Sequence, residues 1–116
     1  MTFDVVALCG KQPEPGEFLA ALLAAGPELR LHTVDETQLV QLFHEDGRLM
    51  LTTEGARLVQ VAGEVARLLR FQGEVPHPVW WVESRAPGHD REAESVARRF
   101  THALLTATGG MSWSSR

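Results

Sequence analysis

One order of patterns occurs twice in this chain: a short apolar run, then a loop, then an amphipathic helix. Residues 3–9 form the first run, and the apolar side chains of residues 17–25 recur at helical spacing after it. Residues 79–82 form the second run, and a longer helical pattern begins after Asp90. A strand followed by a helix commonly leads into a further strand of the same sheet. The two copies therefore predict a sheet covered by helices.

The length and the apolar content are those of one domain. The chain has 116 residues, 44% of them hydrophobic, and such a chain can bury a core without a metal ion or disulfide bonds. Cys9 is its one cysteine, which excludes an internal disulfide. We expect a single α+β domain over residues 1–116, in which residues 110–116 form a partly frayed tail.

Local patterns predict further strands. Residues 29–34 alternate apolar and polar side chains, as a half-exposed strand does. Residues 39–44 and 48–53 flank Glu45-Asp46-Gly47, and Asp-Gly supplies the positive φ angles of a tight hairpin turn. A last strand is expected over Met111-Ser112-Trp113.

Residues 54–71 fit two structures. Their apolar side chains recur at steps of three and four, which forms a helical stripe. Residues 57–61 are also rich in strand-forming side chains, and Gly63 would weaken an unbroken helix by about 1 kcal/mol. A strand over 57–61 followed by a helix over 64–71 is our preferred structure, and one continuous helix is the alternative.

The order of these elements predicts a split βαβ, ferredoxin-like sheet. A β-hairpin insertion enlarges it, and two to three helices lie mainly on one face. A small three-layer α/β fold is the alternative.

Charge and composition limit the classes of partner. The net charge is −4, and the clustered basic face of a nucleic-acid binder is missing. The longest helical apolar stretch, 18–25, is too short to span a bilayer, and the N-terminus has no signal-peptide pattern. We therefore expect a cytoplasmic protein with no nucleic-acid or membrane partner. Ten arginines against one lysine, with no Ile, Asn or Tyr, indicate a GC-rich bacterial genome.

One candidate ligand site depends on strand direction. We expect strands 3–9 and 79–82 to be parallel neighbours, so that the loops after them meet at one edge of the sheet. Lys11, Arg85 and His89 would then lie close together, beside the start of two helices, and would suit an anion such as a phosphate or carboxylate.

Cys9, His89 and Asp90 offer a second use of the same loops, in which the histidine activates the thiol. The alternative is structural: Cys9 is a small buried hydrophobe, Asp90 caps a helix, and His89 is a loop residue. The sequence matches no catalytic motif, so we assign no catalytic residue and no cofactor. The histidines are scattered without ligand spacing, so we assign no metal site.

Tryptophans suggest a partner surface. Trp80 and Trp81 are consecutive in a strand and must point to opposite faces of the sheet. Helices would cover one face and leave one tryptophan on the other, where Trp113 can join it. Residues 57–71 folding over that tryptophan is the alternative.

Residues 59–69 (VQVAGEVARLL), 78–86 (PVWWVESRA) and 97–113, which end in ALLTATGGMSW, resemble small uncharacterised actinobacterial proteins. Some of these are linked to type VII secretion gene neighbourhoods. The resemblance covers about half of the chain, implies a bacterial accessory protein and carries no catalytic residues.

These observations favour a non-enzymatic protein-binding module, such as a bacterial immunity protein or a secretion accessory or chaperone-like protein. Acidic side chains would steer a basic partner if they cluster in space. A small enzyme or anion-ligand domain that uses the loops after strands 3–9 and 79–82 is the alternative, and homodimerisation through the sheet is a third possibility. The acidic side chains concerned are Glu14, Glu17, Asp35, Glu36, Glu45 and Asp46.

Overall fold

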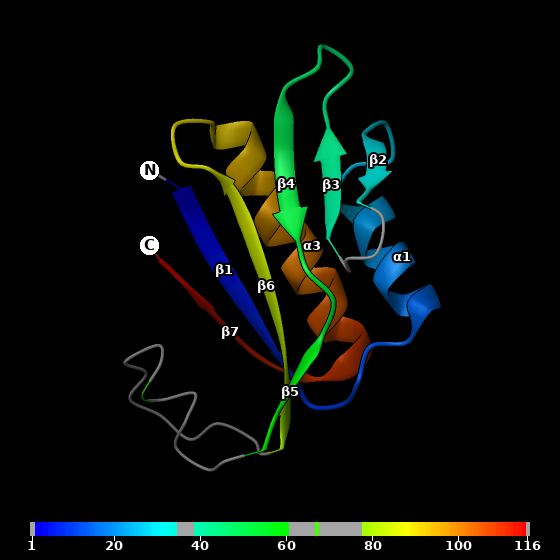
Figure 1. The fold of residues 1–116 in the computed structure, drawn as a ribbon, viewed down its shortest axis with the longest axis vertical. Helices are drawn as coiled ribbons and strands as arrows, with labels where there is room; N and C mark the ends of the chain where they lie inside the picture. The colour runs from blue at the N-terminus through cyan, green and yellow to red at the C-terminus, as the bar shows by residue number, and fades with distance from the viewer. Residues whose placement is uncertain (1, 35–38, 61–66, 68–77, 116) are drawn as a thin grey trace.

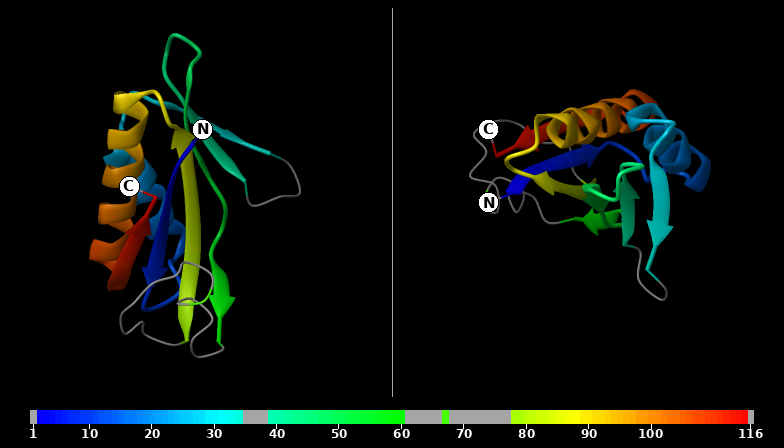
Figure 2. Two further views of the ribbon diagram at one scale, coloured as in Figure 1. Left: turned by 90° about the vertical axis from the view of Figure 1, so that its left-hand side faces the viewer. Right: turned by 90° about the horizontal axis from the view of Figure 1, so that it is seen from above.

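A computed structural model describes residues 2–34, 39–60, 67 and 78–115. It confirms the α+β class, because a seven-stranded sheet carries helices on one face (Figures 1 and 2). The elements are β1 (Thr2–Cys9), α1 (Pro15–Ala25), β2 (Arg30–Thr33), β3 (Val40–Phe43), β4 (Leu49–Thr53), β5 (Arg57–Val59), β6 (Val79–Pro87), α3 (Arg91–Thr108) and β7 (Gly110–Ser114). The predicted helix over 64–71 lies outside the described residues, apart from Arg67.

The strands follow the order β2-β3-β4-β6-β1-β7, with β5 beside β6. β1 therefore has a neighbour on each side. β6 pairs with it from Thr2↔Pro87 to Cys9↔Trp80, and β7 pairs with it from Val5↔Ser114 to Cys9↔Gly110. Helix α3 packs across β1, β4 and β6, and α1 packs on α3.

β1 and β6 are neighbours, as expected, but they run antiparallel and not parallel. The number of reversals between them explains the difference. The α1 crossover makes β2 run in the same direction as β1, and each of the steps to β3, β4 and β6 then reverses the chain. The described strands pair only antiparallel, so the loops after β1 and β6 leave opposite ends of the sheet.

β5 adds no reversal because it continues β4 along the same side of β6. Thr53 of β4 pairs with Ser84, and Arg57 of β5 pairs with Trp81. The predicted strand over 57–61 is confirmed at residues 57–59. β6 extends to Pro87, so residues 83–87, which the sequence placed in a loop, belong to the sheet.

The predicted hairpin between β3 and β4 is confirmed. Gly47 adopts φ 95°, and its N–H donates to the carbonyl of His44 at 2.9 Å, which closes the turn before the strand resumes. A bulge follows, because Leu42 pairs with Leu51 while Phe43 pairs with Leu49. Met50 is the extra residue, and both Met50 and Leu51 are fully buried.

Both described helices begin and end at capping signals. The Asp90 carboxylate accepts hydrogen bonds from the N–H groups of Glu92 and Ala93, as predicted for an N-cap. Gly109 and Gly110 have positive φ angles, and they turn the chain from α3 directly into β7. Helix α1 ends at Ala25, whose carbonyl accepts two hydrogen bonds from the Arg99 guanidinium, at 3.0 and 2.8 Å.

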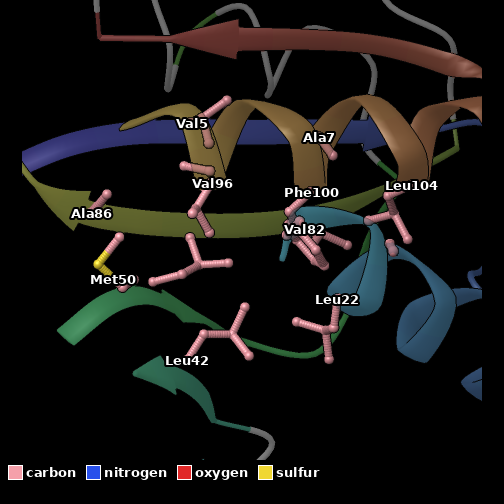
Figure 3. Packing of buried hydrophobic residues seen from close by; sticks show 14 of the residues in the cluster. Val5, Ala7, Leu22, Leu42, Met50, Val82, Ala86, Val96, Phe100 and Leu104 are labelled. Carbon is pink, nitrogen blue, oxygen red and sulfur yellow. The ribbon is translucent and has the colours of Figure 1, made fainter. Parts of the chain in front are cut away.

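The main core lies between the helices and the sheet (Figure 3). Phe100 and Leu104 of α3 are fully buried there against β1, β6 and α1. The Phe18 ring of α1 meets the Phe100 ring edge to face, with 5.4 Å between centroids. The sheet strands contribute side chains that all point to this face: Phe3, Val5, Ala7, Cys9, Leu42, Met50, Leu51, Val82 and Ala86.

Candidate partner-binding groove

An apolar groove with a volume of about 490 Å³ opens beside the first part of α1. Leu31 and Thr33 of β2 and Val40 of β3 line it across from the helix, and residues 55–56 line it as well. The volume lies within the range of small-ligand and peptide pockets, roughly 300–1,000 Å³. None of the described residues that line it is charged; they are Gln12, Pro13, Pro15, Phe18, Leu19, Leu22, Leu31, Thr33, Leu39, Val40, Gly55 and Ala56.

Helix α1 supplies one wall because it has more apolar side chains than its buried face can use. Phe18 and Leu22 point toward the core, whereas Leu19 is 52% exposed on the groove and Leu23, one turn later, is 55% exposed beyond it. A surface helix ordinarily presents polar side chains on its outer face. The hydrogen bonds from Arg99 to the end of α1 hold this wall in place.

Strand β2 supplies the other wall and lies at the edge of the sheet. All four of its residues are exposed, and Leu31 is 47% exposed. Leu31 and Thr33 line the groove. Alternation along the strand puts Arg30 and His32 on the other face, where the His32 ring contacts the Phe43 ring.

We call this site the α1–β2 groove. It can bind an apolar chain segment or ligand, because it offers exposed leucines beside other lining residues that are, where described, uncharged. This groove was not predicted from the sequence: the strand over 29–34 was expected to be half exposed, but the apolar side chains of residues 17–25 were predicted to form one apolar face. The helical pattern could have indicated exposed apolar side chains, because together they cover too wide an arc for one buried face. These side chains are Phe18, Leu19, Leu22 and Leu23.

The predicted anion site is not assembled. Lys11 follows β1 at the end where Cys9 pairs with Trp80, whereas Arg85 lies near the other end of β6, where it pairs with Asp4. His89 lies beyond that same distant end. Lys11 instead forms an ion pair with Glu17 at 3.2 Å, and Arg85 forms one with Asp4 at 3.0 Å. The antiparallel direction of β6 is the reason for this separation.

Cys9 is a buried core residue, which contradicts the thiolate hypothesis. Its side chain has no exposed surface and packs in the core beneath the helices. Burial raises the pKa of the Cys9 thiol, and a hydrogen bond with Thr108 opposes that shift only in part. His89 and Asp90 lie at the other end of β6, so they cannot activate it.

Trp80 and Trp81 point to opposite faces, as predicted. Trp80 packs against the core under the helices, and Trp81 packs with Trp113 and Met111 on the other face. Trp81 is only 7% exposed, so the expectation that a tryptophan lies exposed on the face without helices is wrong for Trp81. The Arg57 guanidinium of β5 stacks over its ring at 5.4 Å. Partner contacts by the half-buried Trp80 and Trp113 stay a prediction.

A charged cluster joins the β3–β4 turn to the start of α3. The Arg48 guanidinium donates to Asp46 at 2.8 Å, to Asp90 at 2.9 Å and to Glu92 at 3.3 Å. His44 Nε2 lies 3.7 Å from a Glu92 oxygen. The backbone N–H of Arg48, and then its side chain, lower the pKa of Asp46. These groups tie the hairpin to the helix layer.

The acidic side chains do not form one patch in the described part of the chain. Glu14 and Glu17 lie at the start of α1, while Glu45 and Asp46 lie at the β3–β4 turn, at the end of the molecule's long axis (Figure 1). Asp35 and Glu36 lie outside the described residues.

Among the described residues, no group of His, Cys, Asp or Glu side chains could hold a metal ion. Neither α1 nor α3 is both long and apolar enough to cross a membrane. No protein-family model, curated protein or solved structure matches the chain.

Proposed function

We propose that the chain is a non-enzymatic protein-binding module that holds an apolar segment of a partner protein in the α1–β2 groove. The observation that carries this proposal is the pair of half-exposed leucines, Leu19 and Leu31, on opposite walls of a groove whose lining is uncharged over the part of the chain that the structure describes. Exposed apolar side chains gathered at one concave place are typical of interaction sites on small domains.

The proposal also includes the class of partner, the cellular location and the detailed fold. The partner is a toxin neutralised by an immunity protein, or a secreted substrate held by an accessory or chaperone-like protein, in the cytoplasm of a bacterium. The fold is a ferredoxin-like core of β1, β4, β6 and β7 with α1 and α3, enlarged by the β2 and β3 strands. Support for this core comes from the order β4-β6-β1-β7, because β6 and β7 run in the same direction, are joined by α3 and have β1 between them.

Selection from a random peptide library tests the function. Peptides enriched on the wild-type protein are measured by fluorescence anisotropy against Leu19→Asp and against Leu23→Asp. The two leucines are one helical turn apart and almost equally exposed, but only Leu19 lines the groove. Circular dichroism confirms that both variants are folded.

We expect Leu19→Asp to weaken the selected peptides at least about tenfold, since a carboxylate would be desolvated in the groove, and Leu23→Asp to leave their affinity unchanged. Equal binding to all three proteins would contradict the proposal, as would the failure to enrich any peptide.

A further inference from the structure

The outer edge of β2 is available for hydrogen bonding. The register with β3 pairs Leu31 with Leu42 and His32 with Gln41, and the Val34 N–H donates to the carbonyl of Leu39. In an antiparallel pair, hydrogen-bonded and non-hydrogen-bonded residue pairs alternate. His32 therefore bonds to β3, whereas the N–H and C=O groups of Leu31 and Thr33 point away from it.

The same two residues direct their side chains into the α1–β2 groove. A strand that pairs with the outer edge of β2 would place every second side chain on the groove side, beside Leu31 and Thr33. Its other side chains would lie on the opposite face, beside Arg30 and His32. Arg30 is the one charged residue of β2 and β3, so the charge that these two strands present to such a strand is positive. Its guanidinium also donates to the Glu45 carbonyl at 3.0 Å.

We propose that the partner segment binds as an added antiparallel strand on β2, with alternating apolar and acidic side chains. The apolar side chains enter the groove, and the acidic ones lie beside Arg30 and His32. This inference rests on the proposed function and names the conformation and chemistry of the segment. Main-chain hydrogen bonds supply affinity and the alternate side chains supply specificity, as in other cases of strand addition.

A second copy of this chain fits the edge less well. Self-pairing that uses all the outward groups of Leu31 and Thr33 is centred on His32, so each Arg30 would lie opposite Val34 of the other copy. β2 has no acidic side chain, so a second copy would bring no charge complement to Arg30. The charge pattern therefore favours an acidic, heterologous strand.

Backbone methylation of a synthetic peptide tests the geometry without changing any side chain. The probe is a capped peptide of alternating glutamate and valine or leucine, with its affinity measured by fluorescence anisotropy. One version carries N-methyl groups on the apolar residues, whose N–H groups would face β2. The matched version carries the same number of N-methyl groups on the glutamates, whose N–H groups would face solvent.

Methylation of the apolar residues is expected to weaken binding at least about tenfold, because hydrogen bonds are lost and the methyl groups contact the edge. Methylation of the glutamates should leave the affinity nearly unchanged. Arg30→Glu should weaken the glutamate peptide and strengthen a lysine counterpart.

Absence of binding by the unmethylated peptide, or equal binding by both methylated versions, overturns strand addition. If peptides selected for the groove still distinguish Leu19→Asp from Leu23→Asp, the proposed function stands and the segment binds in another conformation, such as a helix. A protein that dimerises without peptide, and loses dimerisation on Arg30→Glu or Leu31→Asp, also overturns the inference in favour of a second copy.

Discussion

The central and the edge parts of the sheet use their apolar residues in opposite ways. β1 and β6 have neighbours on both sides, and the helices cover one of their faces, so side chains such as Phe3, Cys9 and Val82 are fully buried. β2 has one neighbouring strand, β3, and α1 stands apart from it across the groove. Leu31 therefore stays half exposed.

This difference separates stability from binding within one sheet. Apolar side chains in the central part contribute to the free energy of unfolding, at about 25 cal/mol per Å² of buried surface. Apolar side chains at the edge are still half exposed, so most of their burial, and of the free energy it releases, would accompany the binding of a partner. Substitutions in the two parts should therefore affect different measurements.

Phe100→Ala should cause the largest loss of stability. The side chain is fully buried and meets Phe18 edge to face. Truncation of such a side chain costs about 3–5 kcal/mol, measured by urea unfolding. Leu31→Ala at the edge is the matched truncation and should change the free energy of unfolding by less than about 0.5 kcal/mol. Similar losses of stability in both variants would show that Leu31 at the edge contributes to folding as much as a core residue does.

Gly110→Ala, in the central part of the sheet, should lower the free energy of unfolding by about 2–3 kcal/mol. Gly110 has φ 118°, and a Cβ there would collide with the Leu8 carbonyl of the paired strand. Gly47→Ala is the control at the β3–β4 turn, because φ is 95° there but a Cβ would meet nothing within 4 Å. We expect it to cost only about 1 kcal/mol. A larger effect at Gly47 than at Gly110 would be a contrary result.

Asp90→Ala should cost about 1–2 kcal/mol, because it removes the N-cap of α3 and one partner of Arg48. Glu92→Ala removes an exposed contact of the same arginine and should cost much less. Thermal unfolding of both variants measures the difference. Equal losses would mean that the link to the hairpin, and not the cap, dominates.

The smallest expected effect is a pH dependence at Asp46. Hydrogen bonds from the backbone and side chain of Arg48 lower the pKa of this carboxyl. Its contribution to stability is therefore present above the unfolded pKa, about 3.9, and is lost as the pH falls through the lower folded pKa. Urea midpoints should show that Asp46→Asn is less stable than wild type near neutral pH, by an amount that shrinks toward pH 3.

Glu45→Gln is the control for Asp46, since it removes the same charge from the same turn. A pH-independent difference between Asp46→Asn and wild type would show that the carboxylate charge contributes nothing.

Elements with a strong local signal were predictable from the sequence, and so was the pairing of β1 with β6, but the direction of β6 was not. The Asp-Gly hairpin, the Asp90 cap and the opposite directions of Trp80 and Trp81 each follow from a few neighbouring residues. The direction of β6 depends on how many times the distant chain reverses before it. The predicted site of Lys11 with Arg85 and His89 failed because it depended on that direction.

The α1–β2 groove was not predicted because its two walls come from separate elements, and their relative position is not encoded in a local sequence pattern. Leu19 follows the same helical pattern as Leu22, and the packing of α1 on α3 buries Leu22 in the core while Leu19 stays exposed on the groove. Residual exposure is a tertiary property, so periodicity alone cannot assign it.

Residue-resolved amide hydrogen exchange by NMR tests most directly whether the β2 edge is open and binds a strand. In the free protein we expect the amides of Leu31 and Thr33 to exchange rapidly and that of His32 to be protected by β3, with strong protection at Val6 and Leu8 in the central part. Adding the alternating glutamate peptide should slow exchange at Leu31 and Thr33. If these two amides are already as protected as His32 in the free protein, or do not respond to the peptide, β2 is not an open edge that binds a strand.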